Sequence, residues 1–188
     1  MQCQYAYSKA SRALSLIGRT ISFKTKDVLI RLYKTFVRPH LEYCVSAWSP
    51  YYVKDRSLLE RVQRRFTRMV PGLKKLSYEK RLEYLGLWTS EEQRNRADLL
   101  EVFKMYKGLS TIPFERLFAL STATNTRGHA AKIAKLHCHL DLRRYFFSER
   151  TVDHWNNLSQ QHISCSTVNS FKNCLNNICH TKTGFFMD

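Results

Sequence analysis

The sequence lacks any long apolar run, and acidic side chains are scarce in it. None of its segments approaches the ~20 consecutive apolar residues that cross a bilayer. Its first residues, MQCQYAYSKASR, have neither the apolar core nor the cleavage site of a secretory signal. We therefore expect no membrane association and a nuclear or cytoplasmic location. The six cysteines, which follow no repeated spacing, are then expected to be reduced thiols.

Motifs of enzyme chemistry are also missing. The chain contains no Asp-Asp pair, and Glu91-Glu92 is its only adjacent acidic pair. That pair falls where a helix is expected to begin, a place where carboxylates favour the helix dipole. Neither a Gly-rich phosphate loop nor a nucleophile elbow occurs. We expect no catalytic residue, no cofactor and no small-molecule substrate.

Cysteine and histidine do not occur at the spacings of a structural zinc site. His137 and His139 are two residues apart, and Cys174-x4-Cys179 is the only cysteine pair near the usual spacing. Thiols in a core and histidines at the surface explain these residues better than a zinc site does. The sequence therefore predicts no metal site.

Positive charge is what the sequence does have. Of its 188 residues, 31 are Lys or Arg and 15 are Asp or Glu, which gives a net charge of +16. The segment 56–81 alone holds nine basic residues against Glu60 and Glu79, a net +7. Such a balance attracts polyanions and does not determine the fold.

Apolar spacing predicts a mainly α-helical protein. Helices are expected over 5–18, ending at Gly18, over 26–38, over 57–69, from Ser77 to Gly86, and from Ser90 to Lys107 before Gly108. In 26–38 the apolar positions are Val28, Leu29, Leu32, Tyr33, Phe36 and Val37. Pro39 should kink or break that helix. Ser57 with Glu60, and Ser90 with Gln93, have the spacing of capping boxes.

The second half of the chain changes composition. Residues 109–128 are rich in Ser and Thr and predict a connector with one short helix near 114–120. Residues 129–140 are ambiguous and allow a short strand pair. Further helices are expected to open at Ser148, with Val152, Trp155 and Leu158 inward, and to span 166–179. The sequence thus predicts a helical bundle over 1–108, the connector 109–128, a small α-rich unit over 129–180 and a tail over 181–188.

The helix over 57–69 is expected to have two faces. Leu58, Leu59, Val62, Phe66 and Met69 form an apolar stripe, and the opposite side carries Arg61, Arg64, Arg65 and Arg68 at spacings of three and four. Like charges at those spacings repel by about 0.2–0.5 kcal/mol per pair, a cost that bound phosphates would offset. A solvated charged surface is the alternative, although such surfaces usually mix signs.

Several segments together resemble a known family. "LYKTFVRPHLEYCVSAWSPY" and "LLERVQRRFTRMVPGLKKLSYEKRLEYLGLWTSEEQRNRADLLEVFKMYKGL" are similar to the region after the polymerase palm in reverse transcriptases of LINE-type (non-LTR) retrotransposons, above all the jockey and chicken-repeat clades. The later "NTRGHAAKI", "RRYFFSERTVDHWNNL" and "STVNSFKNCL" resemble the C-terminal tail of the same proteins. The likeness covers roughly residues 7–178, with its segments in family order.

The resemblance implies a thumb-like bundle that grips RNA, an RNA–DNA hybrid or DNA duplex without reading its sequence. The nucleic-acid-binding residues would be Arg38, His40, Arg61, Arg64, Arg65, Arg68, Lys74 and Lys75. Arg38 and His40 flank the expected bend at Pro39. Near that bend, Trp48, Tyr51 and Tyr52 are expected to be packed rather than to stack on bases, with the stacking platform as the alternative.

The chain departs from the family in its catalytic parts. The palm motif Tyr/Phe-x-Asp-Asp and the endonuclease are missing, and "NNLS" stands where the family usually has Leu-Pro. We therefore expect a non-catalytic fragment that still contacts nucleic acid. Two alternatives stay open: a host protein that reuses the remnant to bind an acidic protein, and an enzyme in its own right, which would need metal-dependent activity.

Overall fold

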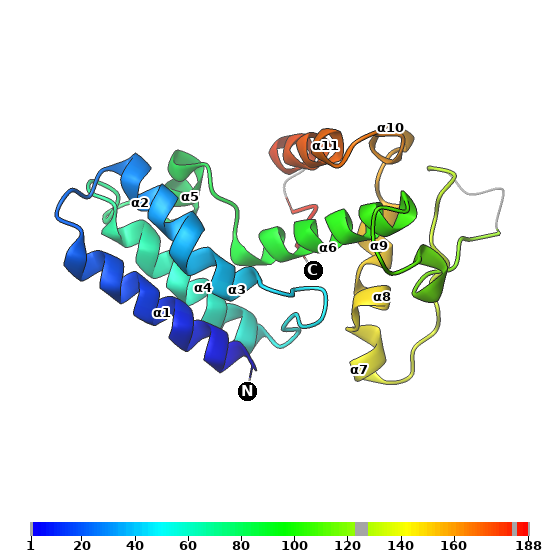
Figure 1. The fold of residues 1–188 in the computed structure, drawn as a ribbon, viewed down its shortest axis with the longest axis horizontal. Coiled ribbons are helices and arrows are strands. Elements are labelled where there is room, and N and C mark those ends of the chain that lie inside the picture. Colours follow the sequence, from blue (N-terminus) through cyan, green and yellow to red (C-terminus); the bar gives the residue numbers. More distant parts are fainter. Residues whose placement is uncertain (1, 123–127, 182–183, 188) are drawn as a thin grey trace. The chain divides into compact units, whose positions relative to one another are not determined.

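A computed structural model describes residues 2–122, 128–181 and 184–187, and in these ranges the chain is mainly α-helical, as predicted (Figure 1). Residues 123–127 of the expected connector, and 182, 183 and 188 of the expected tail, lie outside them. The chain forms two compact units. Unit 1 consists of Met1–Cys44 and Ser49–Arg94, and unit 2 of Val45–Trp48 and Asn95–Asp188. The division falls inside a helix, earlier than the expected one at 108.

Unit 1 is a bundle in which the first helix packs against most of the others. Its elements are α1 (Gln2–Thr20), α2 (Lys26–Leu32), the π-helical η1 (Tyr33–Val37), α3 (Arg38–Glu42), α4 (Val53–Met69) and α5 (Tyr78–Leu85). Helix α1 lies along α4 and also contacts η1 and α3 (Figure 1). The expected end of α1 at Gly18 was wrong, since the helix continues to Thr20. A Cβ at Gly18 would lie only 3.2 Å from Met69 Cε, so this glycine allows a close approach.

Pro39, which was expected to kink or break the helix, does not break the helical path. The chain passes from α2 through η1 into α3, and the Arg38 N–H donates to the Tyr33 carbonyl five residues back. The wider π turn accommodates a proline that has no N–H to give. In an α-helix, side chains four residues apart point in slightly different directions, and the wider π turn compensates for this shift. Leu29, Tyr33, Val37 and Leu41 are therefore all buried, whereas Val28 and Phe36 are exposed.

Helix α4 begins four residues before the expected capping box. Its N-cap is Tyr52, and Ser57 lies inside the helix. Glu60, the expected partner of the Ser57 backbone, instead accepts hydrogen bonds from the Tyr78 hydroxyl and from the Ser90 N–H at 2.9 Å. Arg56 in the first turns forms an ion pair with Glu91. No side-chain cap hydrogen bond forms at Tyr52, and Arg56 and Glu60 contact α5 and α6. The end of α4 at Met69 agrees with the sequence.

The next two helices begin and end close to the predicted positions. Ser77 caps α5 through the Lys80 N–H at 3.4 Å, and Gly86 ends it in the left-handed conformation, as expected. Helix α6 (Ser90–Tyr106) has its capping box one residue earlier than predicted. Thr89 Oγ1 accepts from the Glu92 N–H at 3.2 Å, and Glu92 Oε2 accepts from the Thr89 N–H at 2.8 Å.

Unit 2 is built around the second part of α6 and a set of further helices. They are η2 (Phe114–Arg116), α7 (Asp141–Arg144), α8 (Phe147–Arg150), α9 (Val152–Asn156), α10 (Gln160–Ile163) and α11 (Val168–Thr181). Trp155 lies at the centre, where its indole N–H donates to the Ala131 carbonyl at 2.8 Å. Phe103 and Phe171 stack with ring centroids 4.2 Å apart. In the described residues, one antiparallel bridge between Leu120 and Ile133 takes the place of a strand pair.

Ser148 does not cap a helix, which corrects another expectation. It is buried within α8, while Val152, Trp155 and Leu158 point inward as predicted.

The chain segment just after α3 belongs to unit 2, where Arg150 holds it. Arg150 contacts both carboxylate oxygens of Asp98, with Nε to Oδ2 at 2.9 Å and a terminal nitrogen to Oδ1 at 3.2 Å. The same terminal nitrogen donates to the carbonyls of Val45 at 3.0 Å and Ser46 at 3.4 Å. Asp98 is buried. This ion pair therefore joins α6, α8 and the Val45–Trp48 segment within one unit.

Candidate nucleic-acid interface

Helix α4 has a buried side and a basic side, as the sequence predicts. Leu59, Val62 and Phe66 are at most 1% exposed. The four arginines Arg61, Arg64, Arg65 and Arg68 are exposed, and we call them the basic face. Leu58 and Met69 of the predicted stripe are half-buried, and the polar Gln63 and Thr67 complete the buried side. Within the described chain none of the four arginines forms an ion pair with a carboxylate.

Tyr78 of α5 supports one arginine of the basic face. The Arg64 guanidinium lies over the Tyr78 ring, 4.9 Å from its centroid. The Tyr78 hydroxyl donates to Glu60, which holds the ring in place from α4. Burial, followed by the charge of Glu60, raises the pKa of Tyr78, so this hydroxyl stays protonated as a donor. The stacked guanidinium keeps its N–H groups free at the edges, where phosphate oxygens could reach them.

Arg81, counted in the basic segment, plays a different part. Its side chain is 3% exposed and donates to the carbonyls of Arg64 at 3.3 Å and Ser77 at 3.4 Å. Burial lowers the pKa of Arg81, and the neighbouring Arg68 lowers it further. Arg81 therefore ties α5 to α4 and is not an open contact for a ligand.

The remaining predicted residues fall into two groups. Lys74 and Lys75 are exposed in the turn between α4 and α5, and His40 is exposed on α3. Arg38 differs from the other seven predicted residues because it is partly buried. It donates to Glu42 at 2.6 Å and to Gln93 at 2.9 Å. The structure thus places Arg38 in contacts within unit 1, whereas the basic face and the adjacent lysines are exposed.

Among the aromatic residues near Pro39, the expected packing was wrong for Tyr52. Trp48 and Tyr51 are half-buried, and Tyr52 is exposed. The rings of Tyr51 and Tyr52 lie 4.0 Å apart and are tilted by 38°, so each covers part of the other.

Metal ligands do not gather in the part of the chain that the structure describes. No group of three His, Cys, Asp or Glu side chains there could hold an ion. The rings of His137 and His139 do meet, with centroids 4.6 Å apart, but no third ligand joins them. Among the same residues, no helix combines the length and apolarity needed to cross a bilayer.

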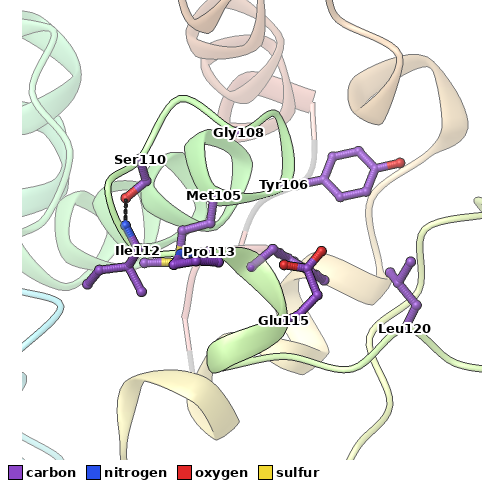
Figure 2. Close-up of a pocket in the computed structure, with 9 residues that line it drawn as sticks. Met105, Tyr106, Gly108, Ser110, Ile112, Pro113, Glu115 and Leu120 are labelled. Carbon is purple, nitrogen blue, oxygen red and sulfur yellow. Dashed lines mark hydrogen bonds between the residues drawn. The ribbon is translucent and has the colours of Figure 1, made fainter.

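Unit 2 contains a separate pocket of about 390 Å³ (Figure 2). It lies where α6 ends and η2 begins, and its lining is Met105, Tyr106, Gly108, Ser110, Ile112, Pro113, Phe114, Glu115 and Leu120. Ser110 Oγ accepts from the Ile112 N–H at 3.4 Å across its wall. Glu115 is the only charged group in this lining, so the pocket would repel a phosphate and is not part of the candidate interface.

Comparisons with known proteins add no relative. The sequence matches no protein-family model, and neither curated proteins nor solved structures give a significant match. The contacts that sequence reasoning missed are Tyr78 beneath Arg64 and the engagement of Arg38 by Gln93. Both join residues on different helices, where local spacing carries no signal.

Proposed function

We propose that this chain holds nucleic acid through its phosphate backbone, without reading sequence and without catalysis. The observation that carries the proposal is the basic face, four exposed arginines on one side of α4 with no carboxylate paired to them. Lys74 and Lys75 extend the positive charge beyond the end of the helix. The resemblance to the thumb region of LINE-type reverse transcriptases supports the same function, as a non-catalytic fragment of such an enzyme.

The chemistry of arginine favours phosphate as the ligand. A planar guanidinium offers paired N–H groups that match two oxygens of one phosphate, and these contacts carry no base information. Bound phosphates would also relieve the mutual repulsion of four like charges within two helical turns. We therefore expect similar affinities for different sequences of equal length and strand type.

Binding is expected to weaken steeply with salt. If the basic face neutralises about four phosphates, log K should fall against log salt with a slope near −3.6 for a duplex, because each contact contributes about −0.9. Titration of a labelled RNA–DNA hybrid at several salt concentrations measures this slope. A flat response, or no binding of a hybrid where an acidic protein does bind, would favour the host-protein alternative.

Removing two arginines should weaken binding without unfolding the protein. Arg65 and Arg68 are the suitable pair because Arg64 stacks on Tyr78 and Arg61 lies 5.9 Å from the Tyr7 ring centroid. In Arg65→Gln/Arg68→Gln, the salt slope should shrink by about 1.8 and the affinity near 0.1 M salt should fall by about 10–100-fold. The free energy of unfolding should change by less than about 0.5 kcal/mol.

The matched control removes the same charge from unit 2. Arg116 and Arg144 are both exposed there, so Arg116→Gln/Arg144→Gln alters the net charge equally. The control should keep nearly all of the affinity. If both variants lose affinity to the same extent, attraction to the overall charge explains the binding and the basic face does not.

A further inference from the structure

Two of the cysteines meet in unit 2. The Sγ atoms of Cys165 and Cys174 lie 3.4 Å apart, although nine positions separate them in sequence. Cys165 follows α10, and Cys174 lies inside α11. The sequence gives no reason to single out this pair, because the spacing matches no common motif.

The surrounding core keeps the two thiols close together. Helix α10 packs against α11, and Ile163, Phe171 and Leu175 are at most 2% exposed beside them. The Cys165 side chain is 8% exposed, with its Sγ 3.7 Å from the Gln161 carbonyl. Cys174 is half-buried, so one sulfur of the pair is open to a small reagent.

We propose that Cys165 and Cys174 are a dithiol site that closes to an intramolecular disulfide by exchange with a low-molecular-weight disulfide such as oxidised glutathione. A disulfide bond is about 2.05 Å long, so the two sulfurs need to approach by roughly 1.4 Å. Side-chain rotation supplies a movement of that size. The geometry therefore favours this pair over any disulfide that must first move a helix.

The exchange proceeds in two balanced steps. The thiolate of Cys174, the more accessible residue, attacks one sulfur of the disulfide reagent, forms a mixed disulfide and releases one glutathione thiolate. The Cys165 thiolate then attacks the Cys174 sulfur and releases the second glutathione. The protein loses two protons and two electrons, and the reagent becomes two glutathione thiols.

The reaction should be slow at neutral pH. Burial and the neighbouring Cys165 raise the pKa of Cys174, so little thiolate is present near pH 7. Because the thiolate is the attacking species, the initial rate should still be rising as the pH passes from 8 to 9. The folded geometry affects the position of equilibrium more than the rate.

The test compares folded and unfolded chains in the same glutathione buffers. In the full-length protein, formation of the 165–174 disulfide should be about 100-fold more favourable than in the urea-unfolded chain, as the closure entropy of a ten-residue loop implies. After alkylation of free thiols and trypsin digestion, the bridge joins peptide 151–172 to peptide 173–182. The second peptide also contains Cys179, so the measurement uses a Cys179→Ser chain.

Two further variants decide the assignment. Cys138→Ser keeps the pair and should oxidise as the parent does, whereas Cys174→Ser should lose the cross-linked peptide. Equal yields of the 165–174 disulfide in the folded and unfolded chains would overturn the proposal. So would a folded chain in which Cys165 prefers another cysteine. Neither outcome bears on the proposed nucleic-acid binding, which involves unit 1.

Discussion

Phe66→Ala should lower the free energy of unfolding of unit 1 by about 3–5 kcal/mol. Phe66 is 1% exposed, and its ring stacks on that of Tyr33 with centroids 4.1 Å apart. The Tyr33 hydroxyl donates to Gln63 at 2.8 Å, and Gln63 donates to the Trp88 carbonyl at 2.6 Å. Removing the ring would leave a cavity beside a buried hydrogen-bond network, which cannot collapse without breaking those bonds.

Phe36→Ala is the matched control, because Phe36 is 56% exposed although the sequence places it on the same apolar stripe as Tyr33. It should change the free energy of unfolding by less than about 0.5 kcal/mol. Urea unfolding measures the free energy of unfolding of both variants. Hydrogen exchange should then locate the loss of stability in α1 and α4. If Phe66→Ala costs no more than Phe36→Ala, the assigned buried side of α4 is wrong.

Arg150→Gln should destabilise unit 2 by about 3–5 kcal/mol, because it removes a cation that pairs with the buried carboxylate of Asp98. The side chain of Asp98 is 3% exposed and that of Arg150 is 15% exposed, so little water could replace the lost contacts. The variant also removes the donors to the carbonyls of Val45 and Ser46. Hydrogen exchange should therefore increase in α6 after Asn95 and in α8, and much less in α1 and α4.

An exposed ion pair of the same unit provides the comparison. Lys135 Nζ and Asp153 Oδ2 lie 2.5 Å apart, and the two side chains are 62% and 63% exposed. Lys135→Gln should cost about 1 kcal/mol or less, since solvent screens such pairs. If Arg150→Gln costs no more than Lys135→Gln, the Asp98–Arg150 pair does not hold unit 2 together.

Local signals predicted the parts of the fold that local chemistry determines. Helix α5 begins after Ser77 and ends at Gly86, as predicted, because a hydroxyl cap and a left-handed glycine act within one helical turn. The helical period alone separated the basic face from Phe66 and Val62. The division of α4 into two sides could thus be predicted from the sequence, whereas its ligand stays a prediction.

Features that depend on distant partners could not be predicted in this way. Ser57 and Glu60 have the spacing of a capping box, but the carboxylate of Glu60 accepts hydrogen bonds from Tyr78 and Ser90 instead. Arg38 has the charge of a phosphate ligand, but Gln93 and Glu42 engage it. A π turn before Pro39 is likewise invisible to a pattern that assumes a constant helical period. In each case the outcome depends on which groups the fold brings within bonding distance.

The hydrogen bonds of Arg150 also affect the order in which the protein can fold during synthesis. Arg150 follows Val45 by 105 positions, so the Val45–Trp48 segment leaves the ribosome long before its partner. At about 5–20 residues per second, that interval lasts roughly 5–20 s. All residues of unit 1 are made by position 94, and its bundle can close during this time. Unit 2 has to recruit a segment synthesised much earlier, so it should become resistant to proteolysis later than unit 1.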